Sequence, residues 1–408
     1  MIPGAPSAPG LADIQAAAVR IHPVARETPT IQSDQLSALS GVDTHVKLES
    51  LQRTGSFKIR GAHNKISQIP DAERRRGVIC ASAGNHGQGV ALSARKLGAP
   101  AWVVMPEEAA YTKVKAIRGY GAQVVLHGAS YDDAYRRARE LCEEKGLTYV
   151  HAYDDPQVVA GQGTIALEVL SALPDCGTIV VPIGGGGLIS GIAIAAKALR
   201  PEVRVVGVVS DQANGALASF RAGARREGVV GFTIADGIRV KQPGELTFPI
   251  IKHLVDEVVE VSEDEIGDAV FTLLQAHKVA VEGAGAAALA AVMAGKVTLT
   301  PPVCAVVSGG NIDLNLLTHA IERGLTTGGT YLSFSTRVPD RPGQLFKLLN
   351  QLAERKLNVL DVWHHRTGVK NPFGIVEIEI VVETKDPEHG EEVLESLRRV
   401  GYDVRRPV

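Results

Sequence analysis

The sequence predicts an α/β protein with parallel sheets covered by helices, followed by a small α+β domain. Up to about residue 320, short apolar segments rich in β-branched residues alternate with Ala-rich amphipathic stretches. These apolar segments are continuous, which indicates strands buried on both faces, as in a parallel sheet. Beyond residue 330, apolar and polar residues alternate strictly, a pattern typical of half-solvated strands.

Six apolar segments are predicted to form the strands of the parallel sheets. The stretches between them, such as HGQGVALSARKLG, have the periodicity of amphipathic helices. This alternation predicts a doubly wound body, to which we assign residues 1–320. The predicted strands are GVICAS (77–82), PAWVVM (100–105), AQVVLHG (122–128), TIVVPI (178–183), VRVVGVV (203–209) and PVCAVVS (302–308).

Residues 331–408 predict the order strand, helix, strand, strand, helix, strand, which is that of a ferredoxin-like unit. The segment HAIERGLTTGGT (319–330) is predicted to be a Gly-rich connection between the two domains. In GIVEIEIVVE, Glu377 and Glu379 face away from the apolar side. The buried face of the first strand is predicted to carry Leu332, Phe334, Thr336 and Val338.

Composition excludes several classes of protein. Of 408 residues 45% are hydrophobic, and 43 Lys and Arg nearly balance 45 Asp and Glu, so neither disorder nor nucleic-acid binding is expected. No apolar run reaches the roughly 18 residues of a membrane helix, and no secretory signal is seen. The 4 cysteines form no CxxC pair, which argues against disulfides and zinc. We therefore expect a cytoplasmic protein without a metal, nucleic acid or membrane as partner.

Lys58 is the first candidate for chemistry. It lies between Phe57 and Ile59 in the segment ESLQRTGSFKIRGAHNKI. An apolar setting would lower the lysine pKa from about 10.4 and make a neutral amine available as nucleophile and base. The alternative is an ordinary lysine on an amphipathic helix with its ammonium in water, which is the commoner case for a single lysine.

Three predicted strands end in residues suited to binding a ligand. GVICAS runs into Ser82 and Asn85, TIVVPI runs into the glycines 184–187, and PVCAVVS ends at Ser308. Open α/β sheets bind ligands beyond the carboxyl ends of their strands, and backbone N–H groups close on a phosphate where no Cβ intervenes. Ser82 or Asn85 as a simple helix cap is the alternative.

The glycine run also allows a dinucleotide site, which requires an acidic residue at the end of the next strand. That strand ends in Val209 and Ser210, so a nicotinamide cofactor is disfavoured. Glu282, which opens the helix in VEGAGA, has a site role or simply favours the positive end of that helix. Together the lysine, the phosphate cradle and the strand-end serine describe a site for a phosphorylated aldehyde held as a Schiff base.

The motifs SFKIRGA, SAGNHGQG, GGGGL, ADGI, VEGAGA and SGGN follow one another within residues 10–320. In these motifs the chain resembles the fold type II pyridoxal-phosphate enzymes, which are tryptophan synthase β-like, and most closely the threonine and serine dehydratases. The resemblance implies pyridoxal 5'-phosphate between two lobes. It also implies that the smaller lobe, about residues 62–155, is inserted in the larger.

The resemblance further implies roles for individual residues. Lys58 would form the Schiff base and later take the α-proton of the substrate. Phe57 would pack near the cofactor ring, Asn85 would bind its phenolic oxygen and Ser308 would meet its pyridine nitrogen. Glu282 is expected at the site without an assigned step. The phosphate would bind Gly184, Gly185, Gly186, Gly187 and Leu188, and the substrate would contact Ser82, Gly84, Asn85, His86 and Gly237.

Ser308 also bears on the reaction. A serine hydroxyl cannot keep the pyridine nitrogen protonated, so the ring is a poorer electron sink and early loss of a β-substituent is favoured. We therefore predict deamination of L-threonine to 2-oxobutanoate and ammonia, and of L-serine to pyruvate. The alternatives are a serine-preferring dehydratase or racemase, or an amino-acid sensor with a vestigial body.

Two departures from related sequences limit these alternatives. Ala83 stands where related racemases carry a second serine as proton donor, so racemisation is expected to be weak. Val209 and Gly215 stand where some relatives bind a divalent cation through carboxylates, so no magnesium or calcium site is predicted there. A monovalent ion bound by carbonyl oxygens is the alternative.

The C-terminal unit resembles an ACT domain through TRVPDRPGQLFKLLNQLAERKLNVLDV. The loop of Asp340, Arg341, Pro342 and Gly343 is expected to take an amino-acid or nucleotide effector, because backbone N–H groups at a helix start bind carboxylates. The alternative is a domain that only forms an oligomer interface. A homodimer or homotetramer is expected, and both a catabolic and an isoleucine-forming role remain open.

Overall fold

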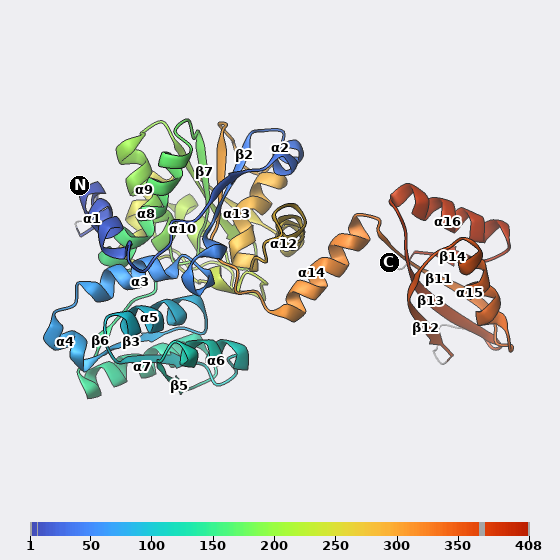
Figure 1. Ribbon diagram of the computed structural model, residues 1–408, viewed down its shortest axis with the longest axis horizontal. Coiled ribbons are helices and arrows are strands. Elements are labelled where there is room, and N and C mark those ends of the chain that lie inside the picture. The colour runs from blue at the N-terminus through green and yellow to red at the C-terminus, as the bar shows by residue number, and fades with distance from the viewer. Residues whose placement is uncertain (1, 6, 367–371, 407–408) are drawn as a thin grey trace. The chain divides into compact units, whose positions relative to one another are not determined.

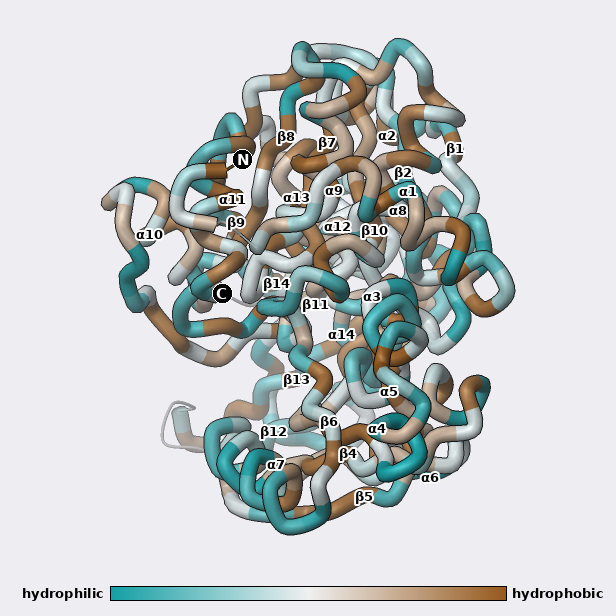
Figure 2. Tube along the Cα trace, turned by 90° about the vertical axis from the view of Figure 1, so that its left-hand side faces the viewer, coloured by the Kyte–Doolittle hydropathy of each residue, from teal (hydrophilic) through white to brown (hydrophobic). Residues whose placement is uncertain are grey.

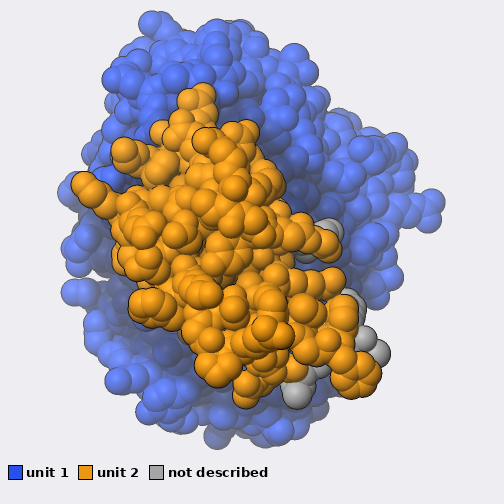
Figure 3. Space-filling view, turned by 90° about the vertical axis from the view of Figure 1, so that its right-hand side faces the viewer, with its two compact units in different colours: residues 1–314 blue, residues 315–408 orange. Residues whose placement is uncertain are grey.

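The computed structural model describes residues 2–5, 7–366 and 372–406. It divides into two compact units, Met1–Leu314 and Asn315–Val408, coloured separately in Figure 3. Residues 315–320, which we predict to belong to the doubly wound body, thus fall in the second unit. Each unit is described by itself.

The first unit contains two sheets. The larger has the order β1-β2-β10-β7-β8-β9, and all its pairings are parallel except β1 with β2. The smaller has the order β5-β4-β3-β6 and is parallel throughout. The larger sheet consists of β1 (Thr30–Gln32), β2 (Thr44–Leu48), β7 (Thr178–Pro182), β8 (Arg204–Ser210), β9 (Glu257–Val261) and β10 (Val303–Val307). The smaller consists of β3 (Val78–Ala81), β4 (Ala101–Met105), β5 (Gln123–Leu126) and β6 (Thr148–Tyr149).

The predicted α/β fold is confirmed, and the six predicted strands correspond to β3, β4, β5, β7, β8 and β10. Four further strands escaped prediction. β1 and β6 have only three and two residues, and β2 and β9 (THVKL and EVVEV) carry charged side chains within the strand. Continuous apolarity therefore finds the apolar strands and misses those that are very short or carry charged side chains.

Helices cover both faces of the larger sheet, as Figure 1 shows around β7. The side chains of Ile179 and Val181 point into a core shared with α8 and α9, while α13 packs on the opposite face beside α12. The helices of this lobe are α1 (Leu11–Ile21), α2 (Asp34–Ser40), α8 (Pro156–Ala172), α9 (Gly187–Leu199), α10 (Gly215–Ala222), α11 (Thr247–Leu254), α12 (Glu263–His277) and α13 (Gly283–Met293).

The smaller sheet is also covered on both faces. Val78 and Cys80 face a core shared with α5 and α6, and Ile79 and Ala81 face a core shared with α7. Figure 2 shows α7 as largely hydrophilic, in keeping with its position on the outside of the sheet. The helices of this lobe are α3 (Lys58–Ser67), α4 (Asp71–Arg76), α5 (Asn85–Lys96), α6 (Tyr111–Gly119) and α7 (Tyr131–Lys145). Because α3 packs against both α5 and α8, it joins the two lobes.

The second unit has an antiparallel sheet of order β12-β13-β11-β14. The predicted ferredoxin-like order is confirmed, and Leu332, Phe334, Thr336 and Val338 are buried. The segment 319–330 differs from prediction, because α14 continues through most of it on apolar residues at helical spacing. The elements are α14 (Leu314–Thr327), β11 (Tyr331–Pro339), α15 (Gln344–Glu354), β12 (Val359–His365), β13 (Ile375–Glu383), α16 (Pro387–Arg399) and β14 (Val404–Arg405).

Candidate active site

The candidate site is assembled at the carboxyl ends of β3, β7 and β10, together with the first turn of α3. The backbone N–H of Phe57 donates to the carbonyl oxygen of Ser308 at 3.1 Å, and Ser56 forms a β-bridge with Gly309. These contacts attach the segment before Lys58 to the end of β10. Lys58 is the first residue of α3.

The amine of Lys58 makes few polar contacts. Its Nζ donates to the carbonyl oxygen of Ala152 at 3.0 Å and lies 5.1 Å from the centroid of the Phe57 ring. Desolvation lowers the pKa of Lys58 to about 8, although the negative charge of Glu282 opposes this shift. A neutral amine is therefore accessible near neutral pH, unlike that of a lysine in bulk water.

The glycine loop after β7 presents unpaired backbone donors. Gly186 adopts a left-handed conformation, with φ at 97°, and α9 begins at the next residue. Among the described residues, no N–H group from Gly184 to Leu188 has a hydrogen-bond acceptor. A Cβ on Gly185 would lie 2.4 Å from ring atoms of Tyr153, so the packing admits only glycine there. Unpaired donors at a helix N-terminus fit a phosphate group.

Asn85 is held between two side chains from distant parts of the sequence. Its Nδ2 donates to Oε1 of Glu282 at 2.6 Å, and its Oδ1 accepts from Nδ2 of Asn311 at 2.7 Å. Asn311 was not predicted as a site residue, although it ends the SGGN motif. The two contacts fix the orientation of the Asn85 amide.

Glu282 is 6% exposed and stands before α13, yet its side chain accepts no capping bond from that helix. Its side chain instead accepts from Asn85, so it does not act as a hydrogen-bonding cap of α13. Desolvation, reinforced by the negative charge of Asp236, raises the pKa of Glu282 to about 7. Its carboxyl group is thus poised to hold a proton near neutral pH.

After β3, some backbone N–H groups are capped by Ser82 and others are left without an acceptor. Ser82 Oγ accepts from the N–H groups of Gly84 at 3.2 Å and Gly87 at 3.0 Å, so it does cap the start of α5. The N–H groups of Asn85 and His86 find no acceptor among the described residues. They are available for an anionic group such as a carboxylate.

The ring of His86 is turned away from these donors. Its Nε2 donates to the carbonyl oxygen of Val150 at 2.9 Å, and desolvation lowers its pKa to about 3. The imidazole is therefore neutral and buried in the smaller lobe. If His86 contacts the substrate, as predicted, it does so through its backbone N–H and not through its ring.

Ser308 and Gly237 both lie against the start of α13. Oγ of Ser308 donates to the carbonyl oxygen of Ala284 at 3.3 Å. Gly237 belongs to a short turn, Asp236–Ile238, and a Cβ there would lie 2.9 Å from Cβ of Ala284 and 3.8 Å from Oε1 of Glu282. All the residues predicted to contact the cofactor or the substrate belong to the first compact unit.

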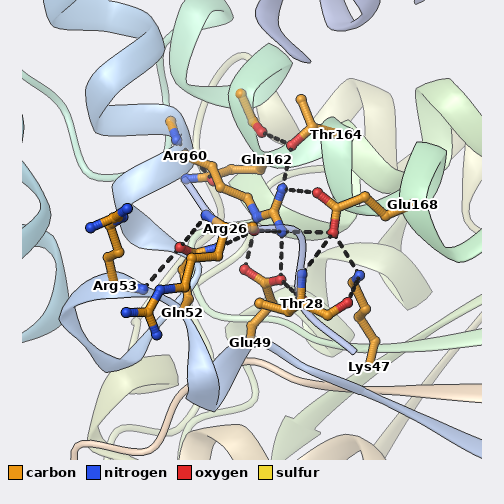
Figure 4. A network of polar contacts seen from close by, with 12 residues as sticks. Arg26, Thr28, Lys47, Glu49, Gln52, Arg53, Arg60, Gln162, Thr164 and Glu168 are labelled. Carbon is orange, nitrogen blue, oxygen red and sulfur yellow. Dashed lines mark hydrogen bonds and ion pairs between the residues drawn. The ribbon is translucent and has the colours of Figure 1, made fainter. Parts of the chain in front are cut away.

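A buried charge network beside the first turn of α3 was not predicted (Figure 4). The guanidinium of Arg60 donates to Oε1 and Oε2 of Glu49 at 2.7 and 2.8 Å and also pairs with Glu168. Nζ of Lys47 donates to Glu168 at 2.6 Å. Arg60, Lys47 and Glu49 are at most 1% exposed. Burial raises the pKa of Glu49, but Arg60 and the Thr28 hydroxyl outweigh burial and hold it below its usual range.

Comparison with known proteins identifies the family. The family model described as "Pyridoxal-phosphate dependent enzyme" matches residues 21–309, and the ACT domain model matches residues 332–401. This chain belongs to the pyridoxal-phosphate-dependent enzymes. The predicted cofactor and family are thereby confirmed, and the unpaired donors of the glycine loop and the amine of Lys58 fit pyridoxal phosphate.

Relatives within this family are similar over nearly the whole chain. An L-threonine ammonia-lyase from Thermotoga maritima is 47% identical over 97% of this chain and 98% of its own length. One from Geobacter sulfurreducens is 48% identical over 95% of this chain and 97% of its own length.

Solved structures of similar proteins cover about three quarters of this chain. A maize serine racemase, 36% identical, has a TM-score of 0.74 and covers 78% of this chain and 99% of its own. The processed form of threonine deaminase isoform 2 from Solanum lycopersicum, 38% identical, has a TM-score of 0.73 and covers 77% of this chain and 88% of its own.

The described part of the chain lacks two other features, a metal-binding cluster and a membrane-spanning helix. No group of three or more His, Cys, Asp or Glu residues there is arranged to hold a metal ion. No described helix combines the length and apolarity needed to cross a membrane.

Proposed function

We propose that this enzyme deaminates L-threonine to 2-oxobutanoate and ammonia, and L-serine to pyruvate. The observation that carries the proposal is a lysine amine with a lowered pKa in the same compact unit as unpaired phosphate-binding donors. The substrate follows from the relatives, since two L-threonine ammonia-lyases are 47% and 48% identical over nearly the whole chain.

Lys58 is proposed as the catalytic base. Pyridoxal phosphate supplies an aldehyde that condenses with amines and an electron-withdrawing ring that acidifies the substrate α-proton. The Lys58 amine, with its pKa of about 8, takes that proton in its neutral form. Its hydrogen bond to the carbonyl oxygen of Ala152 orients the amine.

The remaining residues bind and orient. The N–H groups of Gly184 to Leu188 hold the phosphate, and those of Asn85 and His86 hold the substrate carboxylate. Glu282 and Asn311 fix the Asn85 amide, which leaves one Nδ2 hydrogen for the phenolic oxygen of the cofactor. Ser308 offers the pyridine nitrogen a neutral hydroxyl, which favours early loss of the substrate β-hydroxyl.

Racemisation is the rival activity, because serine racemases share the fold. Ala83 argues against it, since a methyl group cannot return a proton to the opposite face of the substrate. The test is to load the full-length protein with pyridoxal phosphate and supply L-threonine, L-serine and D-serine separately. We expect 2-oxobutanoate from L-threonine and pyruvate from L-serine. Absence of 2-oxobutanoate, or D-serine formed from L-serine as fast as pyruvate, would contradict the proposal.

We assign catalysis to residues 1–320 and regulation by an amino acid or nucleotide to residues 331–408. In the effector loop, the N–H of Asp340 donates to Gly374 and that of Arg341 to Pro339. Pro342 has no N–H, and the N–H of Gln344 donates to the carbonyl oxygen of Arg341. Among the described residues, the amides of Gly343, Leu345 and Phe346 are therefore the donors left for an effector.

Calorimetric titration of the full-length protein with isoleucine, valine and nucleotides tests the effector. We expect heat of binding that Arg341→Ala reduces, because it removes a cation from the loop. Arg405→Ala, at an exposed position of β14, should leave the heat unchanged. Binding that is equal in both variants would contradict the loop assignment. We also propose that the protein is a homodimer or homotetramer in the cytoplasm, with either a catabolic or an isoleucine-forming role.

A further inference from the structure

Asp154 lies in the connection between β6 and α8, where the chain returns from the smaller to the larger lobe. Its Oδ2 accepts from the N–H of Glu245 at 2.9 Å, and its Oδ1 accepts from the N–H groups of Leu246 at 3.0 Å and Thr247 at 3.1 Å. Hydrogen bonds to a charged acceptor are roughly twice as strong as neutral ones. Asp154 therefore fixes the backbone that enters α11.

That backbone in turn holds the glycine loop. Oγ1 of Thr247 donates to the carbonyl oxygen of Gly185 at 2.6 Å, and the N–H of Gly244 donates to the same oxygen at 3.2 Å. A Cβ on Gly186 would lie 2.8 Å from Oγ1 of Thr247, so the contact is close.

The geometry of the peptide bond links this contact to the phosphate donors. The Gly185 carbonyl and the Gly186 N–H belong to one planar trans peptide, so they point in opposite directions. Two hydrogen bonds that fix the carbonyl therefore also aim the N–H of Gly186. That N–H has no acceptor among the described residues.

The connection that carries Asp154 also reaches the reactive lysine. Nδ1 of His151 accepts from the N–H of Asp154 at 2.8 Å, which keeps the turn closed. Between them, Ala152 accepts from Lys58, and the Tyr153 ring packs on Gly185. One short turn thus contacts the glycine loop and the Lys58 amine.

We propose that Asp154 is a positioning residue for the cofactor phosphate, acting through residues 244–247 on the peptide between Gly185 and Gly186. The inference rests on the proposed placement of the phosphate at Gly184 to Leu188. Asp154 touches neither the phosphate donors nor the reacting atoms directly, and no sequence motif singled it out.

The test compares the binding of pyridoxal phosphate and of pyridoxal, which lacks the phosphate, to the full-length apo protein. Both are titrated through the absorbance that forms when Lys58 condenses with the aldehyde. The variants are Asp154→Ala, Asp154→Asn and Thr247→Val, which removes the hydroxyl that holds Gly185. The matched control is Asp155→Asn, because Asp155 caps α8 through Gln157 and Val158 instead.

We expect Asp154→Ala to weaken pyridoxal phosphate about tenfold, as when a group that orients a ligand-binding residue is removed, and to leave pyridoxal nearly unchanged. Asp154→Asn and Thr247→Val are expected to shift the ratio of the two affinities in the same direction by less, and Asp155→Asn not at all. If Asp154→Ala does not fold by circular dichroism, the other two variants decide.

The direction in which Asp154→Asn changes the affinity for pyridoxal phosphate distinguishes a positioning role from a direct effect of the negative charge. A carboxylate that acted on the phosphate through its charge alone would repel it, so Asp154→Asn would bind pyridoxal phosphate more tightly. Tighter binding, an unchanged ratio or an equal shift in Asp155→Asn would overturn the inference. Gly185→Ala tests the placement itself, because its Cβ would strike Tyr153. If Gly185→Ala leaves the ratio unchanged, the placement fails; if only the Asp154 and Thr247 variants leave it unchanged, the positioning role fails.

Discussion

Lys58 and Arg60 lie two residues apart in the first turn of α3, yet their surroundings have opposite effects on their charge. Arg60 contacts the carboxylates of Glu49 and Glu168 directly, and these outweigh burial and raise its pKa. Within the described part of the chain, the Lys58 amine contacts a carbonyl oxygen and a ring but no carboxylate, and desolvation lowers its pKa to about 8.

The difference shows that pairing, rather than burial, decides whether a buried charge is structural or chemical. A buried ion with partners at hydrogen-bond distance keeps its charge, whereas one without them becomes neutral more easily. Glu282 follows Lys58 in this respect. Its nearest partner is the neutral amide of Asn85, and its pKa is raised to about 7.

The largest effect that tests this comparison is expected from Lys58→Ala. Without the amine as base, the rate of 2-oxobutanoate formation from L-threonine should fall by about 10²–10⁴-fold. Lys65→Ala is the control, because Lys65 lies on the same helix and pairs with Asp155. Equal activity in Lys58→Ala and the parent protein would refute the catalytic assignment.

Arg60→Met removes one of the two cations of the buried charge network and leaves the Glu49 carboxylate buried without its cationic partner. We expect the free energy of unfolding, measured in urea, to fall by about 3–5 kcal/mol. Arg136→Met, which breaks an exposed pair with Asp133, should cost far less, because solvent screens the pair. Adding Glu49→Gln to Arg60→Met should recover part of the loss; no recovery would mean that charge pairing is not the cause.

Glu282→Gln tests the electrostatic setting of Lys58. In the proposed mechanism the neutral Lys58 amine is the nucleophile that captures pyridoxal phosphate. The rate of capture by the apo protein should therefore rise with pH, with a midpoint at about 8. Glu282 stabilises the ammonium and so raises the pKa of Lys58. Its replacement should therefore move the midpoint to lower pH. A shift to higher pH would contradict the assigned interaction, and Glu263→Gln, on α12, serves as a control.

The smallest effect is expected at an exposed pair. Nζ of Lys113 lies 2.6 Å from Oδ2 of Asp236, with the side chains 30% and 56% exposed. Solvent screens such a pair, so Lys113→Ala should change the free energy of unfolding by less than about 1 kcal/mol. A loss comparable to that of Arg60→Met would show that exposure does not separate the two classes of pair.

Much of the site could be predicted because its signals are local. A glycine run after an apolar strand restricts what can bind there, since only a bare backbone closes on an anion. The contacts of Asn85 could not be predicted in this way, because Glu282 is 197 residues away and Asn311 is 226. His86 was placed by its neighbours in the motif, but only the fold shows that its ring hydrogen-bonds to Val150.

The sequence by itself predicted the parallel sheets and the C-terminal ferredoxin-like unit, and it singled out Lys58 and the glycine loop as candidate site residues. These follow from periodicity and from backbone requirements that act over a few residues. Only the tertiary structure decided which buried charges are paired, because Coulomb interactions depend on distance in space. Arg60 pairs with Glu168, 108 positions away in the chain, whereas Lys58 has no carboxylate at hydrogen-bond distance among the described residues. That difference separates a structural cation, Arg60, from the amine that we propose as the base, Lys58.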